Sequence, residues 1–454
     1  MLRKIRIAAA AFFFVLTTLL FLDFTGTLHA WFGWMAKIQF LPALLALNVG
    51  VVAFLVILTL LFGRVYCSVI CPLGVMQDIV SWASGKRRKH RNRFAYSPAL
   101  TWLRRGMLVV FVAAMLAGVG SLLAPYSAYG RIASNLLAPV YAWGNNLLAY
   151  IAGRMDSYAF YSVDVWMKSL STLLVAVVTF AVLFVLAWRN GRTYCNTICP
   201  VGTVLGFLAR YSLFKPRFDT SKCNGCKLCA RNCKASCIDP AAHKIDYSRC
   251  VACMDCLENC RQGAITYTLR RRKPDPAPAP QRPAADAAKT PSDASRRRFL
   301  GLAGIVAYSA LRAQEKKVDG GLAVIVDKKI PNRATPVVPP GAQSLRHFNA
   351  HCTGCQLCVS VCPNQVLRPS GKLMTLMQPE MSFERGYCRP ECTKCAEVCP
   401  TGAIRLTDLA GKSSIQIGHA VWIAENCEVN TDGVSCNNCA RHCPAGAIKM
   451  VRRD

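Results

Sequence analysis

The sequence predicts an α-helical membrane bundle with four spanning helices, followed by two small α+β modules that carry most of the cysteines. Two observations lead to this prediction. Apolar residues make up 53% of the 454-residue chain, and the long apolar runs all lie before residue 190. The 25 cysteines gather in short repeated groups, and an odd number in tight C-x-x-C runs argues against a disulfide framework. The net charge of +31 would also suit a nucleic-acid-binding protein, so the position of the basic residues along the chain has to show whether this class applies.

Four apolar runs are long enough to cross a bilayer, which takes about 20 helical residues. They are residues 7–28, 40–62, 105–125 and 170–188, and they define a membrane domain at residues 1–215. A fifth apolar stretch, residues 132–151, contains Pro139 and two asparagines, so we expect it to lie at the interface or to re-enter the membrane. The first run is too long for a cleaved signal peptide, and no small-residue cleavage site follows it.

Basic residues predict which side of the membrane each end of the bundle faces. The N-terminus is basic, and the loop after the second run has six Lys or Arg between residues 86 and 93, whereas the opposite loops have few. We therefore expect both ends of the bundle in the cytoplasm. We interpret the basic loop as an anchor on anionic lipid rather than as a nucleic-acid site. Only His29 lies near these helices, so we expect no haem between them.

Two short cysteine motifs repeat just beyond the second and fourth apolar runs. They are Cys67-x3-Cys71-Pro72 and Cys195-x3-Cys199-Pro200, each preceded by a tyrosine and followed by a glycine. Because both lie on the same face of the membrane, their four thiols can converge on one redox or metal site near the bilayer surface. The alternative is that these are buried structural cysteines.

Residues 216–270 hold two groups of cysteines with the spacing C-x2-C-x2-C-x3-C. The groups are Cys223, Cys226, Cys229 and Cys233, and then Cys250, Cys253, Cys256 and Cys260. This spacing is typical of bacterial ferredoxins with two [4Fe–4S] clusters, in which the fourth cysteine of each group ligates the other cluster. We therefore expect one cluster on Cys223, Cys226, Cys229 and Cys260, and the other on Cys250, Cys253, Cys256 and Cys233.

One cysteine of this module is left over. Cys237 can replace Cys233 as a ligand, because Lys234 stands where a proline usually follows the fourth cysteine. Zinc is the alternative occupant, since C-x2-C pairs also suit a tetrahedral zinc site. The uninterrupted triples of cysteines favour clusters, so we expect a small α+β ferredoxin-like module on the cytoplasmic side.

A linker and a second targeting signal are expected after this module. Residues 271–294 are rich in Pro and Ala, which predicts an extended, solvated linker. Residues 295–313 begin with Ser295-Arg-Arg-Arg-Phe-Leu and continue as a weakly apolar stretch. This order is typical of twin-arginine export signals, which carry folded proteins across the membrane. The alternative is a basic amphipathic helix on the cytoplasmic surface, and whether a signal would be cleaved stays open.

Residues 314–454 are expected to form a multi-cluster ferredoxin-like module in the periplasm. Its three cysteine groups are Cys352, Cys355, Cys358 and Cys362; Cys388, Cys392, Cys395 and Cys399; and Cys427, Cys436, Cys439 and Cys443. Twelve cysteines, all within residues 345–454, suffice for up to three [4Fe–4S] clusters. Such groups exchange their fourth cysteine in pairs, so we expect that a fourth motif is missing through truncation or has been lost.

The four helices, the two C-x3-C-P motifs and the module of residues 216–270 resemble the membrane subunit of the quinol dehydrogenase that serves periplasmic nitrate reductase (NapH type). The twin-arginine run before a multi-cluster module resembles its periplasmic partner (NapG type), so the chain resembles a fusion of the two. NapG-type proteins usually carry four cluster motifs, and this chain has three. The resemblance implies a quinol dehydrogenase component of the bacterial inner membrane. It would oxidise quinol in anaerobic respiration and pass electrons to a periplasmic reductase or small electron carrier.

The cysteine groups by themselves predict an electron relay, because several one-electron centres in series serve to move electrons. Proton acceptors for quinol oxidation would be ionisable groups near the helix ends, and the candidates are Asp23, His29 and Asp78. Two alternatives stay open: donation to a different oxidoreductase, or an iron–sulfur sensor or assembly factor for a respiratory enzyme. The expected partners are membrane lipid, the quinol pool and the electron acceptor, without nucleic acid.

Overall fold

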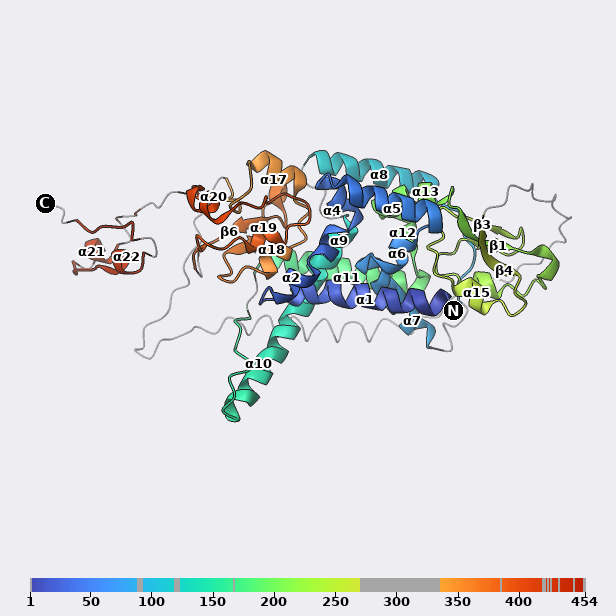
Figure 1. Cartoon of the computed structure of the whole chain (residues 1–454), viewed down its shortest axis with the longest axis horizontal. Helices are drawn as coiled ribbons and strands as arrows, with labels where there is room; N and C mark the ends of the chain where they lie inside the picture. The colour runs from blue at the N-terminus through green and yellow to red at the C-terminus, as the bar shows by residue number, and fades with distance from the viewer. Residues whose placement is uncertain are drawn as a thin grey trace.

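A bundle of apolar helices forms the middle of the molecule and separates two cysteine-rich modules (Figure 1). The computed structural model describes residues 2–87, 93–117, 123–165, 168–269, 335–383, 386–418, 422, 424, 427–431, 433–443 and 446–451. The predicted linker at 271–294 and the predicted export signal at 295–313 lie outside the described residues.

Four helices form the long walls of the bundle and correspond to the four predicted runs. They are α1 (Leu2–Leu22), α5 (Val49–Phe62), α8 (Thr101–Leu116) and α11 (Leu170–Asn190). Among the described residues, α1 and α11 are the two helices long and apolar enough to cross a membrane, at 21 residues each. α5 has 14 residues and α8 has 16. At about 1.5 Å per residue they are shorter than a hydrocarbon core of about 30 Å, so two of the four expected spans reach the required length.

Short helices return into the bundle between its long helices. Between α1 and α5 lie α2 (Thr27–Phe32), α3 (Trp34–Lys37) and α4 (Phe40–Leu45). The Tyr66 hydroxyl anchors this return, because it accepts the backbone N–H of Phe40 at 3.1 Å and donates to Gln39 at 2.9 Å. The second return is α9 (Pro125–Ile132), whose eight residues are all buried.

The sequence predicts an interfacial or re-entrant segment at residues 132–151, whereas the buried segment that returns into the bundle is α9, which ends at Ile132. After a π-helical turn, η3 (Ala133–Leu137), the chain forms α10 (Ala138–Arg154), in which no residue is buried and which leans away from the bundle (Figure 1). Pro139 stands in the first turn of α10, directly after the π-helical turn η3.

Each C-x3-C-P motif joins a short helix to a longer one. α6 (Val65–Val69) leads into α7 (Pro72–Gly85), and α12 (Thr193–Thr197) leads into α13 (Pro200–Ala209). In both cases the proline occupies the first turn of the second helix. α7 packs on α1 and α11, and α13 packs on α5 and α8. The two motifs therefore belong to the core of the bundle.

The first module packs at the end of the bundle where α1 begins. Strand β1 (Phe214–Phe218) pairs antiparallel with β4 (Ile265–Leu269), and β2 (Ile238–Asp239) pairs with β3 (Lys244–Ile245). The turn η4 (Thr220–Lys222) and the helices α14 (Leu228–Arg231) and α15 (Asp255–Asn259) complete this α+β unit. It is joined to α5 by the stacked rings of Phe62 and Phe214, whose centroids are 5.6 Å apart.

The second module packs at the opposite end, where α1 ends (Figure 1). It contains α17 (Leu345–His351), α18 (Leu357–Ser360), η6 (Leu373–Thr375), α19 (Lys394–Glu397), α20 (Leu409–Ser414) and the antiparallel pair β5 (Leu367–Pro369) and β6 (Pro379–Met381). Asn135 donates to the side chain of Gln356 at 2.9 Å, and Lys394 donates to the carbonyl oxygen of Thr25 at 3.0 Å. Helices α21 (Glu428–Thr431) and α22 (Asn438–Arg441) lie apart from this unit (Figure 1).

Candidate functional site

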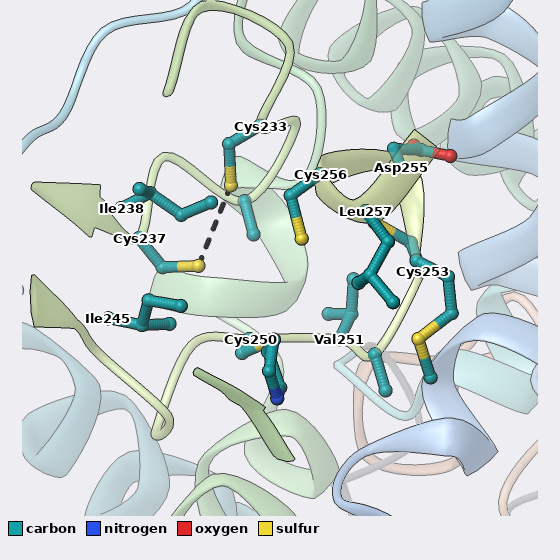
Figure 2. A pocket seen from close by; sticks show the side chains of 14 residues that line it. Cys233, Cys237, Ile238, Ile245, Cys250, Val251, Cys253, Asp255, Cys256 and Leu257 are labelled. Atoms are coloured by element: carbon teal, nitrogen blue, oxygen red, sulfur yellow. Dashed lines mark hydrogen bonds between the residues drawn. The ribbon is translucent and has the colours of Figure 1, made fainter. Parts of the chain in front are cut away.

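Five cysteine thiols of the first module line one pocket (Figure 2). They belong to Cys233, Cys237, Cys250, Cys253 and Cys256. The space between them measures about 410 Å³ up to its open mouth, and apolar side chains from β2 and β3 form part of its wall. Soft thiolate ligands around a space several atoms wide suit an iron–sulfur cluster. The pocket brings together the predicted ligands of one cluster and the spare cysteine.

The spare cysteine, Cys237, lies beside the predicted fourth ligand, Cys233. Their sulfur atoms are 3.6 Å apart. The hydrogen bond that Cys237 donates lowers the pKa of the Cys233 thiol to about 7, against the effect of burial. Cys237 also donates toward Cys250 and lowers the pKa of that thiol. The arrangement favours Cys233 as the thiolate ligand and Cys237 as a neighbour that donates hydrogen bonds to ligand sulfur.

The other predicted cluster of this module also has its cysteines in one place. The thiol of Cys229 interacts electrostatically with those of Cys223, Cys226 and Cys260, while its pKa is raised to about 11 by burial. The exchange of the fourth cysteine between the two groups is therefore visible in the fold. Which cysteines bind iron stays a prediction.

The second module repeats this exchange. Cys362, Cys388, Cys392 and Cys395 line a pocket of about 330 Å³. Cys352, Cys355 and Cys358 face Cys399 instead, with electrostatic interactions among their thiols. No three His, Cys, Asp or Glu side chains in the described part of the chain meet closely enough to ligate a single metal ion. The donors that line the pockets of both modules are cysteine thiols, which are the ligands of an iron–sulfur cluster.

The third predicted group does not join these sets. Cys439 lies in α22, which is separated from the rest of the second module (Figure 1). Cys427, Cys436 and Cys443 flank α21 and α22, and the Cys443 thiol accepts the backbone N–H of Ala447 at 3.3 Å. Sequence reasoning grouped these cysteines with the other eight, and the structure keeps them apart.

The four thiols of the C-x3-C-P motifs are buried together in the bundle core. Two arginines cross between the motifs in a reciprocal way. Arg64 donates to the carbonyl oxygen of Cys195 at 3.1 Å, and Arg192 donates to the carbonyl oxygen of Cys67 at 2.6 Å. Both guanidinium side chains are fully buried. Sequence reasoning missed these arginines, although each stands three residues before the first cysteine of its motif and so belongs to the same repeat.

Two glycines of the repeat permit this close packing. A Cβ atom added to Gly74 would collide with the carbonyl oxygen of Cys67 and would lie 2.7 Å from Nη1 of Arg192. Gly202 occupies the equivalent position in the other motif, where a Cβ atom would lie 2.8 Å from Nη2 of Arg64. Only glycine therefore allows each arginine to reach across to the other motif.

Further contacts surround the buried thiols. The Cys199 sulfur accepts the backbone N–H of Gly202 at 3.4 Å, and Gln77 donates to the Cys195 sulfur at 3.3 Å. Burial, with the neighbouring thiols, raises the pKa of Cys71 to about 12. Without a metal the Cys71 thiol is thus protonated at neutral pH, and metal binding would release its proton.

The proposed proton acceptor Asp78 is held by positive charges. It accepts from Nε of Arg192 at 2.7 Å, lies 3.2 Å from Nζ of Lys234, and is bonded to Arg6. Burial by itself would raise the pKa of Asp78, but the charges of Arg192 and Lys234 outweigh burial and hold it well below its usual value. This environment favours a structural anion over a proton acceptor.

The other two candidates, Asp23 and His29, contact each other where α1 ends. The Asp23 carboxylate lies 3.1 Å from Nδ1 of His29 and accepts the backbone N–H groups of Gly26 and Leu28, each at 2.9 Å. Burial opposes ionisation of Asp23, but hydrogen bonds from His29, Thr25 and Gly26 lower its pKa well below the usual value. Nε2 of His29 is buried, with no hydrogen-bond partner among the described residues.

Comparison with known proteins identifies two cluster-binding regions. A family model described as "4Fe-4S binding domain" matches residues 44–90 and 172–221, which contain both C-x3-C-P motifs. A model described as "4Fe-4S dicluster domain" matches residues 351–403, which contain the first two cysteine groups of the second module. The chain is an iron–sulfur electron-transfer protein.

Three similar proteins each align with less than half of this chain. An uncharacterized protein of Methanocaldococcus jannaschii, MJ0749, is 25% identical over 214 residues, or 47% of this chain and 68% of that protein. The methylamine utilization ferredoxin-type protein MauN of Paracoccus denitrificans is 28% identical over 172 residues, or 38% of this chain and 48% of MauN. The ferredoxin-type protein NapH of Escherichia coli is 29% identical over 195 residues, or 42% of this chain and 55% of NapH. The chain thus spans about half the length of the latter two, and no solved structure matches it.

Proposed function

We propose that this chain is a membrane-bound quinol dehydrogenase component that relays electrons through [4Fe–4S] clusters to a periplasmic reductase of the nitrate-reductase type. The observation that carries the quinol part of the proposal is the Asp23–His29 pair. Asp23 is an anion that holds Nδ1 of His29 as a hydrogen-bond donor, so the lone pair of the neutral ring lies on Nε2. Nε2 is buried and has no hydrogen-bond partner among the described residues.

This pair meets the two requirements of a proton acceptor for quinol oxidation. A general base needs a free lone pair and a fixed orientation, and a carboxylate on the second ring nitrogen supplies the orientation. The pair also stands where α1 ends, close to the second module, because Lys394 donates to Thr25 at 3.0 Å. A proton taken by His29 would leave on that side of the bundle, while the electrons enter the clusters.

Membrane insertion is supported by the outer faces of the long helices. Large apolar side chains are exposed on α1, α5, α8 and α11, including Phe12, Phe54, Val109 and Val178, which are 53–67% exposed. Such continuous apolar faces suit contact with lipid. We propose that α1, α5, α8 and α11 all cross the membrane, with α10 at its surface, and that residues 1–215 form the membrane domain.

The two modules then face different compartments. α1 begins at the first module and ends at the second, so a spanning α1 puts them on opposite sides. Following the basic loops, we propose that residues 216–270 are cytoplasmic and residues 314–454 periplasmic, joined by the linker at 271–294 and exported through the signal at 295–313. The bound clusters would supply reversible one-electron redox chemistry. The chain's cysteines hold them, and the surrounding apolar walls exclude water.

The experiment that tests the proposal is anaerobic mixing of the purified full-length chain with a menaquinol analogue, followed by EPR of the clusters. We expect quinol to reduce the clusters, and His29→Gln to slow that reduction about 10²–10⁴-fold while dithionite reduction stays unchanged. His243→Gln, in the first module, is the matched control and should leave the rate unchanged. If quinol leaves every cluster oxidised while dithionite reduces them, the quinol function is wrong.

A second candidate keeps the relay and changes the electron acceptor. The chain is similar both to NapH and to MauN, whose name refers to methylamine utilization, so the likeness does not single out nitrate reductase. The reduced chain should be offered periplasmic reductases of different classes and small electron carriers. Oxidation of its clusters by one of them, and not by the others, would identify the acceptor. Clusters that none of them oxidises would favour a sensor or assembly factor.

A further inference from the structure

The core of the bundle holds a buried positive charge that calls for an anion. Arg64 is fully buried and donates to Asn196 at 2.8 Å and to the carbonyl oxygen of Ser248 at 3.2 Å. No carboxylate of the described residues forms an ion pair with it, and its Nε has no hydrogen-bond partner there. An uncompensated buried charge is strongly unfavourable. Nη2 of Arg64 lies 3.8 Å from the sulfur of Cys67, a group that can bind a metal as a thiolate.

The partner arginine faces the same thiols. Arg192 pairs with Asp78 through Nε, and its Nη1 lies 4.0 Å from the Cys195 sulfur. Its Nη2 is buried without a hydrogen-bond partner among the described residues. The unpartnered Nη2 of Arg192 and the guanidinium of Arg64, which has no carboxylate partner among the described residues, are a second sign that this site accepts an anion.

The helices that follow the two motifs add to this effect. Cys71 and Cys199 stand directly before the N-termini of α7 and α13, which have 14 and 10 residues. The N-terminus of a helix carries partial positive charge and exposes free backbone N–H groups, which stabilise a thiolate. The Cys199 sulfur accepts such an N–H group, from Gly202 at 3.4 Å.

We propose that Cys67, Cys71, Cys195 and Cys199 together hold one iron–sulfur centre, shared between the two motifs and separate from the clusters of the two modules. Soft thiolates select iron–sulfur, zinc or copper(I), and four of them on a [4Fe–4S] unit carry a charge of about −2. Arg64, which has no carboxylate partner among the described residues, offsets part of that charge, and Arg192 lies beside the same thiols although it is paired with Asp78. The pseudo-symmetric crossing of the two arginines explains why the chain needs both motifs, because each motif supplies the arginine that faces the other.

The position of this centre makes it the connection between the two modules. On one side, Arg64 bonds to Ser248 and interacts electrostatically with Cys250 of the first module. On the other side, Tyr194 donates to the carbonyl oxygen of Leu123 at 3.3 Å, directly before the buried helix α9. Eight helical residues span about 12 Å.

The far end of α9 reaches the second module. A Cβ atom on Gly130 would lie 2.5 Å from the carbonyl oxygen of Cys355. Arg131 interacts electrostatically with both Tyr194 and Cys355. The path from the first module to the second therefore passes the four thiols, and the centre would take one electron from a neighbouring cluster and give one to the next. This inference does not depend on quinol as the donor.

Iron analysis of the anaerobically purified full-length chain tests the site. We expect Cys67→Ser with Cys195→Ser to lose about four iron and four acid-labile sulfide per chain, while the EPR signals of the module clusters persist. Ile79→Ala, at an exposed position of α7 that contacts none of the four thiols, should keep the full iron content. Unchanged iron in the double variant, or zinc or copper in place of iron in the unaltered chain, would overturn the proposal.

Redox titration provides a second test that does not require a ligand to be removed. Arg64→Gln deletes a positive charge beside the centre, so the reduction potential of one centre should fall while the others stay constant. Arg64→Lys keeps the charge and should restore most of that shift, and Arg105→Gln, at an exposed site of α8, should change nothing. A titration in which Arg64→Gln shifts no potential, or shifts only the module clusters, would overturn the assignment.

Discussion

The ammonium group of Lys234 lies 3.2 Å from the carboxylate of Asp78, and this contact joins the first cysteine-rich module to the helical bundle. Lys234 follows the predicted ligand Cys233 and also lies 3.0 Å from Asp255 of α15. Asp78 in turn accepts from Arg192, next to the buried thiols. One carboxylate therefore connects the module, the bundle and the buried arginine.

Replacing Asp78 with Asn should destabilise the chain and loosen the first module. The pKa of Asp78 is held well below its usual value, so it is an anion at neutral pH, and its removal leaves buried cations unpaired. Breaking a buried pair in this way costs about 3–5 kcal/mol. Thermal unfolding of the detergent-solubilised chain, with limited proteolysis of residues 216–270, measures the effect.

The control is an ion pair at the same junction that is exposed to solvent. Arg3 pairs with Glu258, and their side chains are 40% and 50% exposed. Exposed pairs contribute about 0–1 kcal/mol, so Glu258→Gln should change the unfolding temperature little. Equal effects of the two substitutions would show that Asp78 has no special role.

Cys237 should tune a cluster without ligating it. Its hydrogen bond lowers the pKa of Cys233 and stabilises the thiolate form of that sulfur. We expect Cys237→Ala to keep all iron and to lower the reduction potential of one cluster, because hydrogen bonds to ligand sulfur favour the reduced state. Iron analysis and an EPR-monitored titration measure both quantities.

The comparison variant is Cys233→Ala, which should lose iron from that cluster. The two sulfur atoms are only 3.6 Å apart, so Cys237 could also reach the ligand position that we assign to Cys233. If Cys237→Ala loses the iron and Cys233→Ala keeps it, the spare cysteine is the ligand and our assignment of the fourth position is wrong.

Local sequence patterns were sufficient to predict the long helices and the cysteines that lie together in each module. The apolar runs around α1 and α11 are long and uninterrupted, and the cysteine spacing of the modules encodes which thiols meet. The returning helix α9 could not be predicted, because Pro125–Ile132 is only eight residues long and includes Ser127 and Arg131, so it has little overall apolar character. Its burial results from contacts with α1, α11 and the second module, which are distant in sequence.

Only part of the buried site around the C-x3-C-P motifs could be predicted from the sequence. The four thiols of the C-x3-C-P motifs were found because cysteine has few roles, whereas arginine is usually a surface residue. Arg64 and Arg192 become significant only when the fold places each beside the motif of the other. Asp78 is the opposite case, a residue that the sequence suggested for a role the structure does not favour. Its place at a helix end suggested proton transfer, but its three cationic neighbours favour a structural role.

Gly74→Ala should remove the iron of the proposed buried centre. The added methyl group would collide with the carbonyl oxygen of Cys67 and displace Arg192, and such overpacking costs about 1–3 kcal/mol. We expect a loss of about four iron per chain and a lower unfolding temperature. Gly85, in the same helix, has open space around its Cα, so Gly85→Ala should keep the iron content. Full iron in Gly74→Ala would contradict the described packing.

Gly130→Ala should detach the second module from the bundle. The new Cβ atom would lie 2.5 Å from the carbonyl oxygen of Cys355 and 2.8 Å from the ring of Phe21, and neither the backbone nor a fully buried ring can move far. We expect faster hydrogen exchange at Phe21 and in residues 351–360, at an iron content equal to that of the unaltered chain. Because α9 is the path toward Cys355, electron transfer between the modules should slow as well.

The control for this variant is Gly144→Ala, in the exposed helix α10. No atom lies within 4 Å of its added Cβ, so exchange and electron transfer should stay as in the unaltered chain. If Gly130→Ala instead preserves slow exchange at both Phe21 and residues 351–360, the second module does not dock on α9. A path between the modules that passes through α9 would then be excluded, even if the buried thiols bind iron.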